Sequence, residues 1–377
     1  MRVGLVVYGS LEVVSGGNLY DQNLVSHLRS SGHSVEVVSI PLRSYALNLA
    51  QNLSPGLRRR LTEPSFDVLL EDELAHPSLV RLNRVLRRRI AAPPTSIVSI
   101  VHHLRSSEDR PEWQNDLYRR VEKSHLLSVD AFVFNSETTR ETVESLLGKK
   151  TRSVVATPGG DRFSRAVTPA EVAARAVEEG ELRILFAGNL IPRKGLHYLL
   201  KALHSLEGRA FRLDVVGSET SDRRYAASVR QQARELGLGG RVHFHGTLAG
   251  ENLEERFRAA QLLVVPSSYE GFGIVYLEAM GFGLPVIASA SGATDEIVRH
   301  ESTGFLVPPG DVWILARRIE SLLEDRSLLS QMSLAAYDAF EDHPGWKDSM
   351  TRIEGFLAGL LELTEGVEIR RASLAET

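Results

Sequence analysis

The chain has 377 residues, of which 43% are apolar and 24% are charged, and its formal net charge is −4. This length suits two domains of ordinary size, and the negative balance excludes a global positive field for nucleic acid. Because the chain has no cysteine, disulfides, thiolate nucleophiles and thiolate metal sites are excluded as well.

The chain begins with a short apolar run that ends in Tyr8, Gly9 and Ser10. The run is too short for the apolar region of a signal peptide, and it predicts a first β-strand. No stretch approaches the roughly 20 apolar residues that a membrane-spanning helix needs. We therefore expect a cytoplasmic protein.

Strand-like and helix-like segments alternate through the first half of the chain. Runs of β-branched or apolar residues predict strands at residues 3–7, 35–40, 67–70, 97–101, 131–134 and 154–156. Helical patterns lie between several of these runs, at residues 19–30, 79–90 and 113–127. Such alternation is typical of βαβ units, which form a parallel sheet with helices on both faces.

The alternation pauses at residues 164–180, which hold a proline and several charges but no strand pattern, so we predict a linker with a short helix there. It then restarts, with strands expected at 182–187, 211–216, 242–244, 262–265, 285–288 and 305–307 and helices at 196–206, 222–236, 251–260, 273–282 and 311–324. We therefore predict an α/β protein with two Rossmann-like doubly wound domains, residues 1–165 and 181–343, and a boundary near 165–181. A C-terminal helix at 346–365 is expected to pack back on the first domain.

The loop after the first strand ends in Gly16 and Gly17, just before a helix. Two glycines at this place let backbone amides approach an anionic group, although a tight strand-to-helix turn has the same appearance. The loop is not the G-x-G-x-x-G fingerprint, and the second strand ends in Ser39 and Ile40 rather than in an acidic residue. Both facts count against a dinucleotide-dependent dehydrogenase.

Arginines gather twice in the first half, at residues 58–60 and within 81–89. Helical spacing puts Arg81, Arg84 and Arg88 near one face of a helix whose other side is apolar. Such a face can contact an anionic membrane surface from the cytoplasmic side, or it can be an ordinary solvated face. Both interpretations stay open.

His102 and His103 follow the strand expected at residues 97–101. A histidine at the carboxyl end of a strand points into the ligand crevice, where it can donate hydrogen bonds or act as an acid or base, but many such histidines are structural. Neither histidine has a metal-ligand partner at a recognisable spacing, and the chain lacks an Asp-x-Asp element. We therefore expect no metal cofactor.

The loop at residues 188–195 follows the first strand of the second half and is bounded by glycines. It carries Arg193 and Lys194, which suit a pyrophosphate group because arginine offers a fork of donors and lysine a point charge. A solvated turn with two charges is the alternative. Its position at the end of a strand favours a binding role.

The strongest site signal lies in residues 266–285. Glu270 and Glu278 are separated by seven residues, and residues 271–273 open a helix between them. Free amides at the helix N-terminus can bind a phosphate group. Glu278 is expected roughly 8 Å further along the helix than Glu270, too far for the two carboxylates to share one proton, so we expect them to bind different hydroxyl groups of one long ligand. The helix dipole alone would explain Glu270 but not Glu278 among apolar neighbours.

The second half of the chain resembles a known family most firmly. Glu270 and Glu278 match the paired glutamates of the retaining glycosyltransferase family four, the glycosyl transferases group 1. Residues 188–195 resemble the family's diphosphate loop, with Lys194 as its lysine. Residues 304–311 are similar to a stretch near the end of the family's second domain.

The first half carries the resemblance further, so that it covers nearly the whole chain. Gly16 and Gly17 match the family's glycine loop, His102 matches its strand-end histidine, and residues 157–161 look like the segment before its interdomain linker. The resemblance implies the GT-B fold, with two Rossmann-like domains facing each other across a cleft. It also implies that the first domain binds the acceptor and the second the nucleotide sugar.

The resemblance implies transfer of a hexose from a UDP- or GDP-sugar to an acceptor hydroxyl, with retention and without metal, in glycolipid, polysaccharide or small-glycoside synthesis. In this interpretation His102 lies near the reacting sugar, Lys194 binds the diphosphate and Glu270 binds sugar hydroxyls. Glu278 binds the ribose. The full set of expected substrate-binding residues is Gly16, Gly17, Asn189, Arg193, Gly217, Gly271, Phe272, Gly273, Ile274, Val275 and Glu278.

The sequence departs from the family pattern at two places. Asn189 stands where the family has an arginine, and Gly292 with Ala293 stands where it has two glycines. Three alternatives stay open, namely a nucleotide-sugar epimerase, a phosphorylase-like enzyme and a non-catalytic protein that binds a nucleotide sugar. The sequence does not name the sugar, the base, the acceptor or the oligomeric state.

Overall fold

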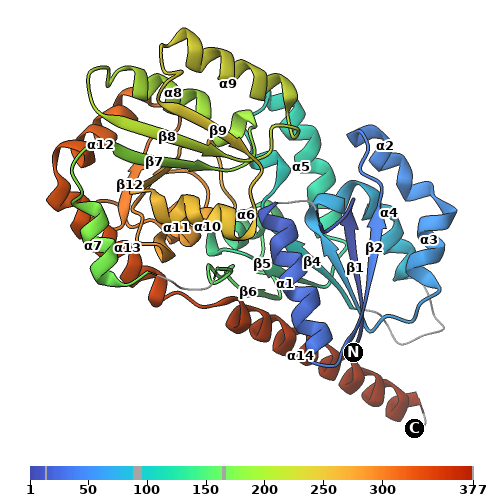
Figure 1. The fold of residues 1–377 in the computed structure, drawn as a ribbon. Helices are drawn as coiled ribbons and strands as arrows, with labels where there is room; N and C mark the ends of the chain where they lie inside the picture. Colours follow the sequence, from blue (N-terminus) through green and yellow to red (C-terminus); the bar gives the residue numbers. More distant parts are fainter. Residues whose placement is uncertain (13–14, 88–95, 164–166, 376–377) are drawn as a thin grey trace. The chain divides into compact units, whose positions relative to one another are not determined.

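The computed structural model describes residues 1–12, 15–87, 96–163 and 167–375. The chain divides into two compact units (Figure 1), of which the first consists of Met1–Pro158 and Trp346–Thr377 and the second of Gly159–Gly345. Within the described ranges, no helix is both long enough and apolar enough to cross a membrane.

The first unit contains a parallel sheet with the strand order β2-β1-β3-β4-β5-β6. Its strands are β1 (Arg2–Tyr8), β2 (Ser34–Ile40), β3 (Val68–Asp72), β4 (Ser96–Val101), β5 (Ala131–Phe134) and β6 (Ser153–Val155). Its helices are α1 (Gly16–Ser30), α2 (Tyr45–Ala50), α3 (Pro55–Thr62), α4 (His76–Leu86), α5 (Glu112–Leu126), α6 (Glu137–Leu147) and α14 (Trp346–Ala375), with short 3-10 turns η1 (Gln51–Leu53), η2 (Glu73–Ala75) and η3 (Arg105–Ser107). The strand order reverses between β1 and β3, which is where ligands bind in open α/β sheets.

The first unit is held by apolar residues on both sides of its sheet. Buried side chains from β1–β3 pack with α3 and α4, and those from β4 and β5 pack with α5 and α6. Helix α14 returns from the far end of the sequence to pack beside α1, where the Trp346 and Tyr20 rings lie 5.9 Å apart edge to face. The Tyr20 hydroxyl donates to the backbone oxygen of Ala156, so this corner also fixes the end of β6.

The second unit contains a parallel sheet with the strand order β12-β11-β10-β7-β8-β9, the Rossmann arrangement. Its strands are β7 (Leu182–Ala187), β8 (Phe211–Val216), β9 (Val242–Gly246), β10 (Leu262–Val265), β11 (Val286–Ser289) and β12 (Gly304–Val307). Its helices are α7 (Pro169–Ala176), α8 (Leu196–His204), α9 (Arg223–Glu235), α10 (Gly250–Ala259), α11 (Ile274–Gly281), α12 (Val312–Glu324) and α13 (Arg326–Glu341), with 3-10 turns η4 (Pro192–Lys194) and η5 (Thr294–Glu296). The order reverses between β7 and β10.

Local chemistry explains several helix ends in the second unit. Thr168 and Glu171 form a reciprocal capping box at the start of α7, with Pro169 as its first residue. Asp311 and Asp325 accept hydrogen bonds from the first turns of α12 and α13. These caps satisfy amide groups that a helix cannot satisfy itself.

The strands lie within two residues of the positions that the sequence predicts. The boundary between the two units, by contrast, differs from the predicted one. The chain divides after Pro158, ahead of the expected 165–181, because α7 packs against α13 and Val172 is fully buried. Residues 169–176 therefore belong to the second unit and are not a linker. Helices α2, α3, α6 and α13 lie where we predicted no element. The first two are short, and α13 follows α12 after a single residue, Asp325.

Candidate functional site

The loops after β7 and β10 meet at the point where the strand order of the second unit reverses. Lys194 Nζ lies 2.5 Å from Glu270 Oε1, and Arg193 Nη1 lies 3.4 Å from Glu270 Oε2. Ser267 donates its hydroxyl to the same carboxylate at 2.6 Å. The structure therefore brings together the two cations and the first glutamate that the sequence singled out in separate motifs.

The charges of this group support one another. Burial disfavours the ionised form of Glu270, but Lys194 and Arg193 outweigh it and hold the pKa of that carboxyl at about 2. Burial also lowers the pKa of the Lys194 ammonium. Since Glu270 is ionised, each of its oxygens keeps a lone pair with which it can accept from a ligand hydroxyl.

Glycines let the backbone segments that form this site approach one another closely. A Cβ atom on Gly195 would lie 2.1 Å from the Pro266 oxygen, and one on Gly217 would lie 1.9 Å from the Gly188 oxygen. Half-buried Asn189 comes directly after Gly188 in the chain. Its backbone nitrogen would lie 3.2 Å from the same Cβ atom on Gly217. Any side chain at these two glycines would separate the loops.

Helix α11 begins four residues after Glu270, at the end of the β10 loop. Gly273 has φ 102° and precedes the helix, while Ile274 and Val275 are its first two residues and are half-buried. Their amides belong to the first turn, which has no acceptor within a helix, so they can bind an anionic group. Phe272 is buried beneath the turn, between Gly271 and Gly273.

Glu278 does not join the Lys194 group, because it lies further along α11 and pairs with Arg162. The guanidinium contacts both carboxylate oxygens, with Nε 2.9 Å from Oε1 and Nη2 3.0 Å from Oε2. Burial raises the pKa of Glu278 to about 7, against the opposing charge of Arg162. Arg162 lies outside every motif, and sequence reasoning missed it.

Arg193 is fixed by the β10 loop. Its Nη1 donates to the Tyr269 oxygen at 2.6 Å, in addition to its contact with Glu270. The Arg193 guanidinium therefore lies beside Lys194 at the end of β10. It can supply positive charge near Asn189, the position at which the family that the sequence resembles has an arginine.

In the first unit, Gly17 lies against His102. A Cβ atom on Gly17 would be 3.2 Å from His102 Cδ2, so only glycine leaves the ring in place without a shift. Gly16 and Gly17 begin α1, which is capped by Ser15. This packing connects the glycine loop to the strand-end histidine that the sequence predicted separately.

Buried Asp21, which sequence reasoning missed, accompanies His102. Asp21 Oδ1 lies 3.4 Å from His102 Nε2, and the Tyr20 ring packs edge-on against the imidazole. Burial lowers the pKa of His102, but Asp21, with Asp72 and Glu73, outweighs burial and raises it overall. Asp21 sits one turn into α1, where a helical pattern alone does not distinguish it from a surface residue. His103 instead pairs with Glu108.

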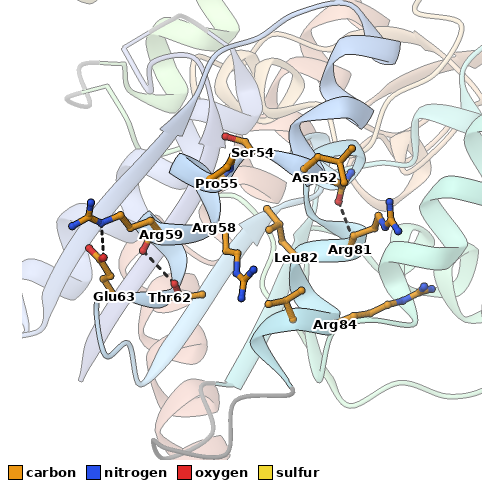
Figure 2. A pocket seen from close by; sticks show the side chains of 12 residues that line it. Asn52, Ser54, Pro55, Arg58, Arg59, Thr62, Glu63, Arg81, Leu82 and Arg84 are labelled. Atoms are coloured by element: carbon orange, nitrogen blue, oxygen red, sulfur yellow. Dashed lines mark hydrogen bonds and ion pairs between the residues drawn. The ribbon is translucent and has the colours of Figure 1, made fainter.

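The arginines of the first unit line a hollow between α3 and α4 (Figure 2). The hollow has a volume of about 710 Å³, and its lining includes Arg58, Arg59, Arg81 and Arg84. Arg59 pairs with Glu63 across one turn of α3. Arg88, the third member of the expected helical face, lies outside the described residues.

Comparison with known proteins relates the second unit to one family of enzymes. Residues 168–339 match the family model described as glycosyl transferases group 1. The chain is 34% identical over 223 residues to a D-inositol 3-phosphate glycosyltransferase of Nocardia farcinica, a match that covers 57% of this chain and 49% of that protein. It is 30% identical over 245 residues to a GDP-mannose-dependent alpha-(1-6)-phosphatidylinositol monomannoside mannosyltransferase of Mycobacterium tuberculosis, covering 61% of this chain and 62% of the relative. The chain thus spans about half to three fifths of the length of these two relatives.

Solved structures show the same fold. Sucrose-phosphate synthase from Thermosynechococcus elongatus is 22% identical with a TM-score of 0.80, covering 96% of this chain and 99% of that chain. Anabaena Alr3699/HepE in complex with UDP and glucose is 20% identical with a TM-score of 0.74, covering 95% and 99%. The predicted GT-B fold with two Rossmann-like domains is confirmed.

Proposed function

We propose that this chain, whose residues 168–339 match the glycosyl transferases group 1, moves a hexose from a nucleoside diphosphate sugar to an acceptor hydroxyl with retention at the anomeric carbon. The observation that carries the proposal is the meeting of Lys194, Arg193 and Glu270 beside the N-terminus of α11. Cations and free amides suit a departing diphosphate, and an ionised carboxylate suits sugar hydroxyls.

Each group has one role in this mechanism. The amides of Ile274 and Val275 bind the diphosphate, and Lys194 with Arg193 stabilises the charge that develops as it leaves. Glu270 accepts from the hexose hydroxyls, and Glu278 accepts from the ribose. Catalysis is then mostly positioning and charge stabilisation.

The donor and the reaction are tested in two steps. A thermal-shift screen of UDP-, GDP- and ADP-sugars identifies the donor, since a ligand at 100 times its dissociation constant stabilises by about 2.7 kcal/mol. NMR spectra of fresh product, formed with simple polyols and inositol phosphates as acceptors, then report the anomeric configuration. An inverted anomer contradicts retention. Two outcomes contradict the proposed transferase activity. One is a product that is a free epimerised nucleotide sugar, and the other is that none of these donors stabilises the protein.

We expect the diphosphate to bind without a divalent ion, because Lys194 and Arg193 already supply positive charge at the loop pair. Calorimetry of the nucleoside diphosphate should give dissociation constants within about threefold of each other in EDTA and in excess magnesium, a difference of under 1 kcal/mol. Binding that disappears in EDTA and returns with magnesium would show that a metal bridges the phosphates. Binding, rather than turnover, is the readout because it reports on the second unit alone.

Nucleotide affinity should depend on pH through Glu278. Below pH 7 its carboxyl is protonated, and it must lose that proton to accept from two ribose hydroxyls, so affinity should fall by about tenfold from pH 8 to pH 6. The Glu278→Gln variant controls for titration of the ligand's own phosphates, which is the same in both proteins. Equal pH profiles for the two proteins would remove Glu278 from ribose binding.

We also propose that the arginine hollow contacts anionic lipid, which fits a lipid-linked acceptor. Arg58 and Arg81 have no side-chain ion pair among the described residues, and Leu53 beside them is 70% exposed. Each cation near an anionic surface is worth roughly 1 kcal/mol, so Arg58→Ser with Arg81→Ser should weaken liposome binding by about 30-fold in sedimentation assays. Paired serine substitutions at Arg223 and Arg224, exposed on α9, should change it little. If the protein binds neutral and anionic vesicles equally and negligibly, the arginine hollow is an ordinary solvated surface.

A further inference from the structure

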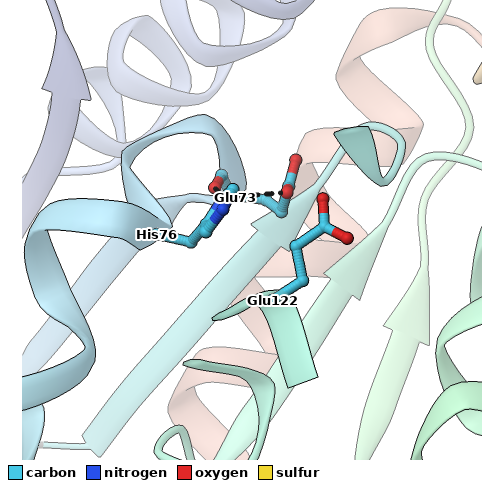
Figure 3. A group of neighbouring side chains, drawn as sticks. All are labelled: Glu73, His76 and Glu122. Carbon is cyan, nitrogen blue, oxygen red and sulfur yellow. Dashed lines mark hydrogen bonds and ion pairs between the residues drawn. The ribbon is translucent and has the colours of Figure 1, made fainter. Parts of the chain in front are cut away.

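Three buried titratable side chains meet where β3 of the first unit ends (Figure 3). Glu73 lies in η2, His76 begins α4, and Glu122 lies on α5, 46 residues further along the chain. Glu73 and His76 are each 1% exposed, and Glu122 is 0% exposed. One oxygen of each carboxylate and one ring nitrogen of His76 all lie within 4.8 Å of one another.

The carboxylates are poorly satisfied by the protein. Among the described residues, both oxygens of Glu73 and Oε2 of Glu122 lack a hydrogen-bond donor, although His76 Nδ1 lies 3.2 Å from Glu73 Oε1. The other oxygen of Glu122 accepts from the Ser106 amide at 3.2 Å. Buried carboxylate oxygens without partners are costly, so their presence points to a ligand that satisfies them.

The surroundings do not neutralise the two carboxylates. The neighbouring histidines contact other carboxylates, since His125 Nε2 lies 2.8 Å from Glu71 Oε2 and His103 Nε2 lies 3.0 Å from Glu108 Oε1. Asp72, the neighbour of Glu73, is buried too. Arg105 is the nearby cation, but its guanidinium stacks 4.9 Å over the Tyr118 ring, and within the described ranges it makes no ion pair with the group. Like charges in such a place require shared protons or a bound cation.

His76 offers a ring nitrogen to such a cation, and the imidazole is buried within the group. Nδ1 lies 2.8 Å from the Glu73 backbone oxygen and Nε2 lies 3.1 Å from the Tyr45 hydroxyl. Metal-binding histidines commonly keep one such second contact, which fixes the ring, and an ion would replace the other.

We propose that Glu73, His76 and Glu122 bind one divalent transition-metal ion, which joins the end of β3 to α5. Two carboxylates and an imidazole form the mixed oxygen and nitrogen set that suits Zn²⁺ or Mn²⁺ better than Mg²⁺. Ligand atoms about 2.0–2.2 Å from an ion lie at most about 4.4 Å apart, so the observed spacing needs only a small side-chain adjustment.

The sequence predicts no metal, because only ligands at a short spacing are recognisable in a sequence. Glu73 and His76 have such a spacing, but the third ligand comes from a different helix. The inference concerns the first unit alone and does not depend on the proposed sugar transfer.

The test uses the full-length, tag-free chain after removal of metals by chelation. Incubation with Mn²⁺ or Zn²⁺ followed by dialysis and elemental analysis should leave about one ion per chain, and the ion should raise the melting temperature, whereas Mg²⁺ should do so much less. Glu73→Gln and Glu122→Gln should each weaken binding by at least about tenfold, the lower end of effects seen for metal-site changes. Glu112→Gln, which removes an exposed carboxylate from the same helix, should leave binding unchanged.

Two results would overturn the proposal. If the wild-type chain retains no ion and neither metal changes its melting temperature, the carboxylates share a proton instead. If both amide variants bind as tightly as the wild type, the ion lies elsewhere. The wild-type measurement decides the question even if a variant fails to fold. In metal-free buffer we expect Glu122→Gln to be at least as stable as the wild type, since it removes one of two buried like charges.

Discussion

The Lys194→Ala variant should lower kcat by a factor of about 10²–10³ at saturating donor, the usual cost of losing one donor to charge that develops in a transition state. Lys194 is the ammonium closest to Glu270 at the diphosphate loop, and no other described lysine lies in that loop. Measured kcat for donor and acceptor, with product followed directly, checks the prediction.

A second variant separates catalysis from folding. Lys194→Ala leaves the Glu270 carboxylate buried with only Arg193 and Ser267, and breaking a buried pair in this way costs roughly 3–5 kcal/mol of stability. Adding Glu270→Gln removes that charge and should restore the melting temperature. Because Glu270→Gln lowers kcat by itself, kcat is compared between the single Glu270→Gln variant and the double variant, and loss of Lys194 should still lower it. Lys201→Ala, at an exposed position on α8, is the matched control. An equal kcat for the single Glu270→Gln variant and the double variant would reduce Lys194 to a structural role.

Replacing Glu278 by alanine should lower the affinity for the nucleotide, whereas replacing Glu270 should lower kcat. Glu278→Ala should weaken the free nucleoside diphosphate by about ten- to a hundredfold, because a hydrogen bond to a charged group is worth roughly 1.5–3 kcal/mol. Glu270→Ala should lower kcat while leaving this affinity within a few-fold, because Lys194 loses its internal partner and is free to bind phosphate. Calorimetry with each variant and the nucleoside diphosphate is the decisive measurement.

The Arg162 pair provides the control for Glu278. Arg162→Ala removes the partner but keeps the carboxyl group. Because Arg162 lowers the pKa of Glu278, the comparison needs a pH high enough to keep Glu278 ionised in the variant, where Arg162→Ala should not reproduce the loss of affinity that Glu278→Ala causes. If Arg162→Ala weakens the nucleotide equally, Glu278 acts by holding Arg162 rather than by binding the ribose. If Glu270→Ala weakens the nucleotide as much as Glu278→Ala does, the proposed division of roles is incorrect.

The sequence by itself determined the elements and the motif loops. The strands follow from short apolar runs at regular intervals, and Glu270, Glu278 and Lys194 were recognisable because glycines mark strand-to-helix turns. These signals are local, since β-branched runs, glycine turns and helix caps act over a few residues. The similarity to the glycosyl transferases group 1 and the GT-B fold were predictable for the same reason.

Only the tertiary structure decided which of these residues are partners. Lys194 and Glu270 are 76 residues apart and meet because β7 and β10 are neighbours at the point where the strand order reverses. Arg162 reaches Glu278 across 116 residues, and Glu122 on α5 reaches the end of β3. Such pairs depend on strand order and helix packing, which place distant segments together and leave no trace in local spacing.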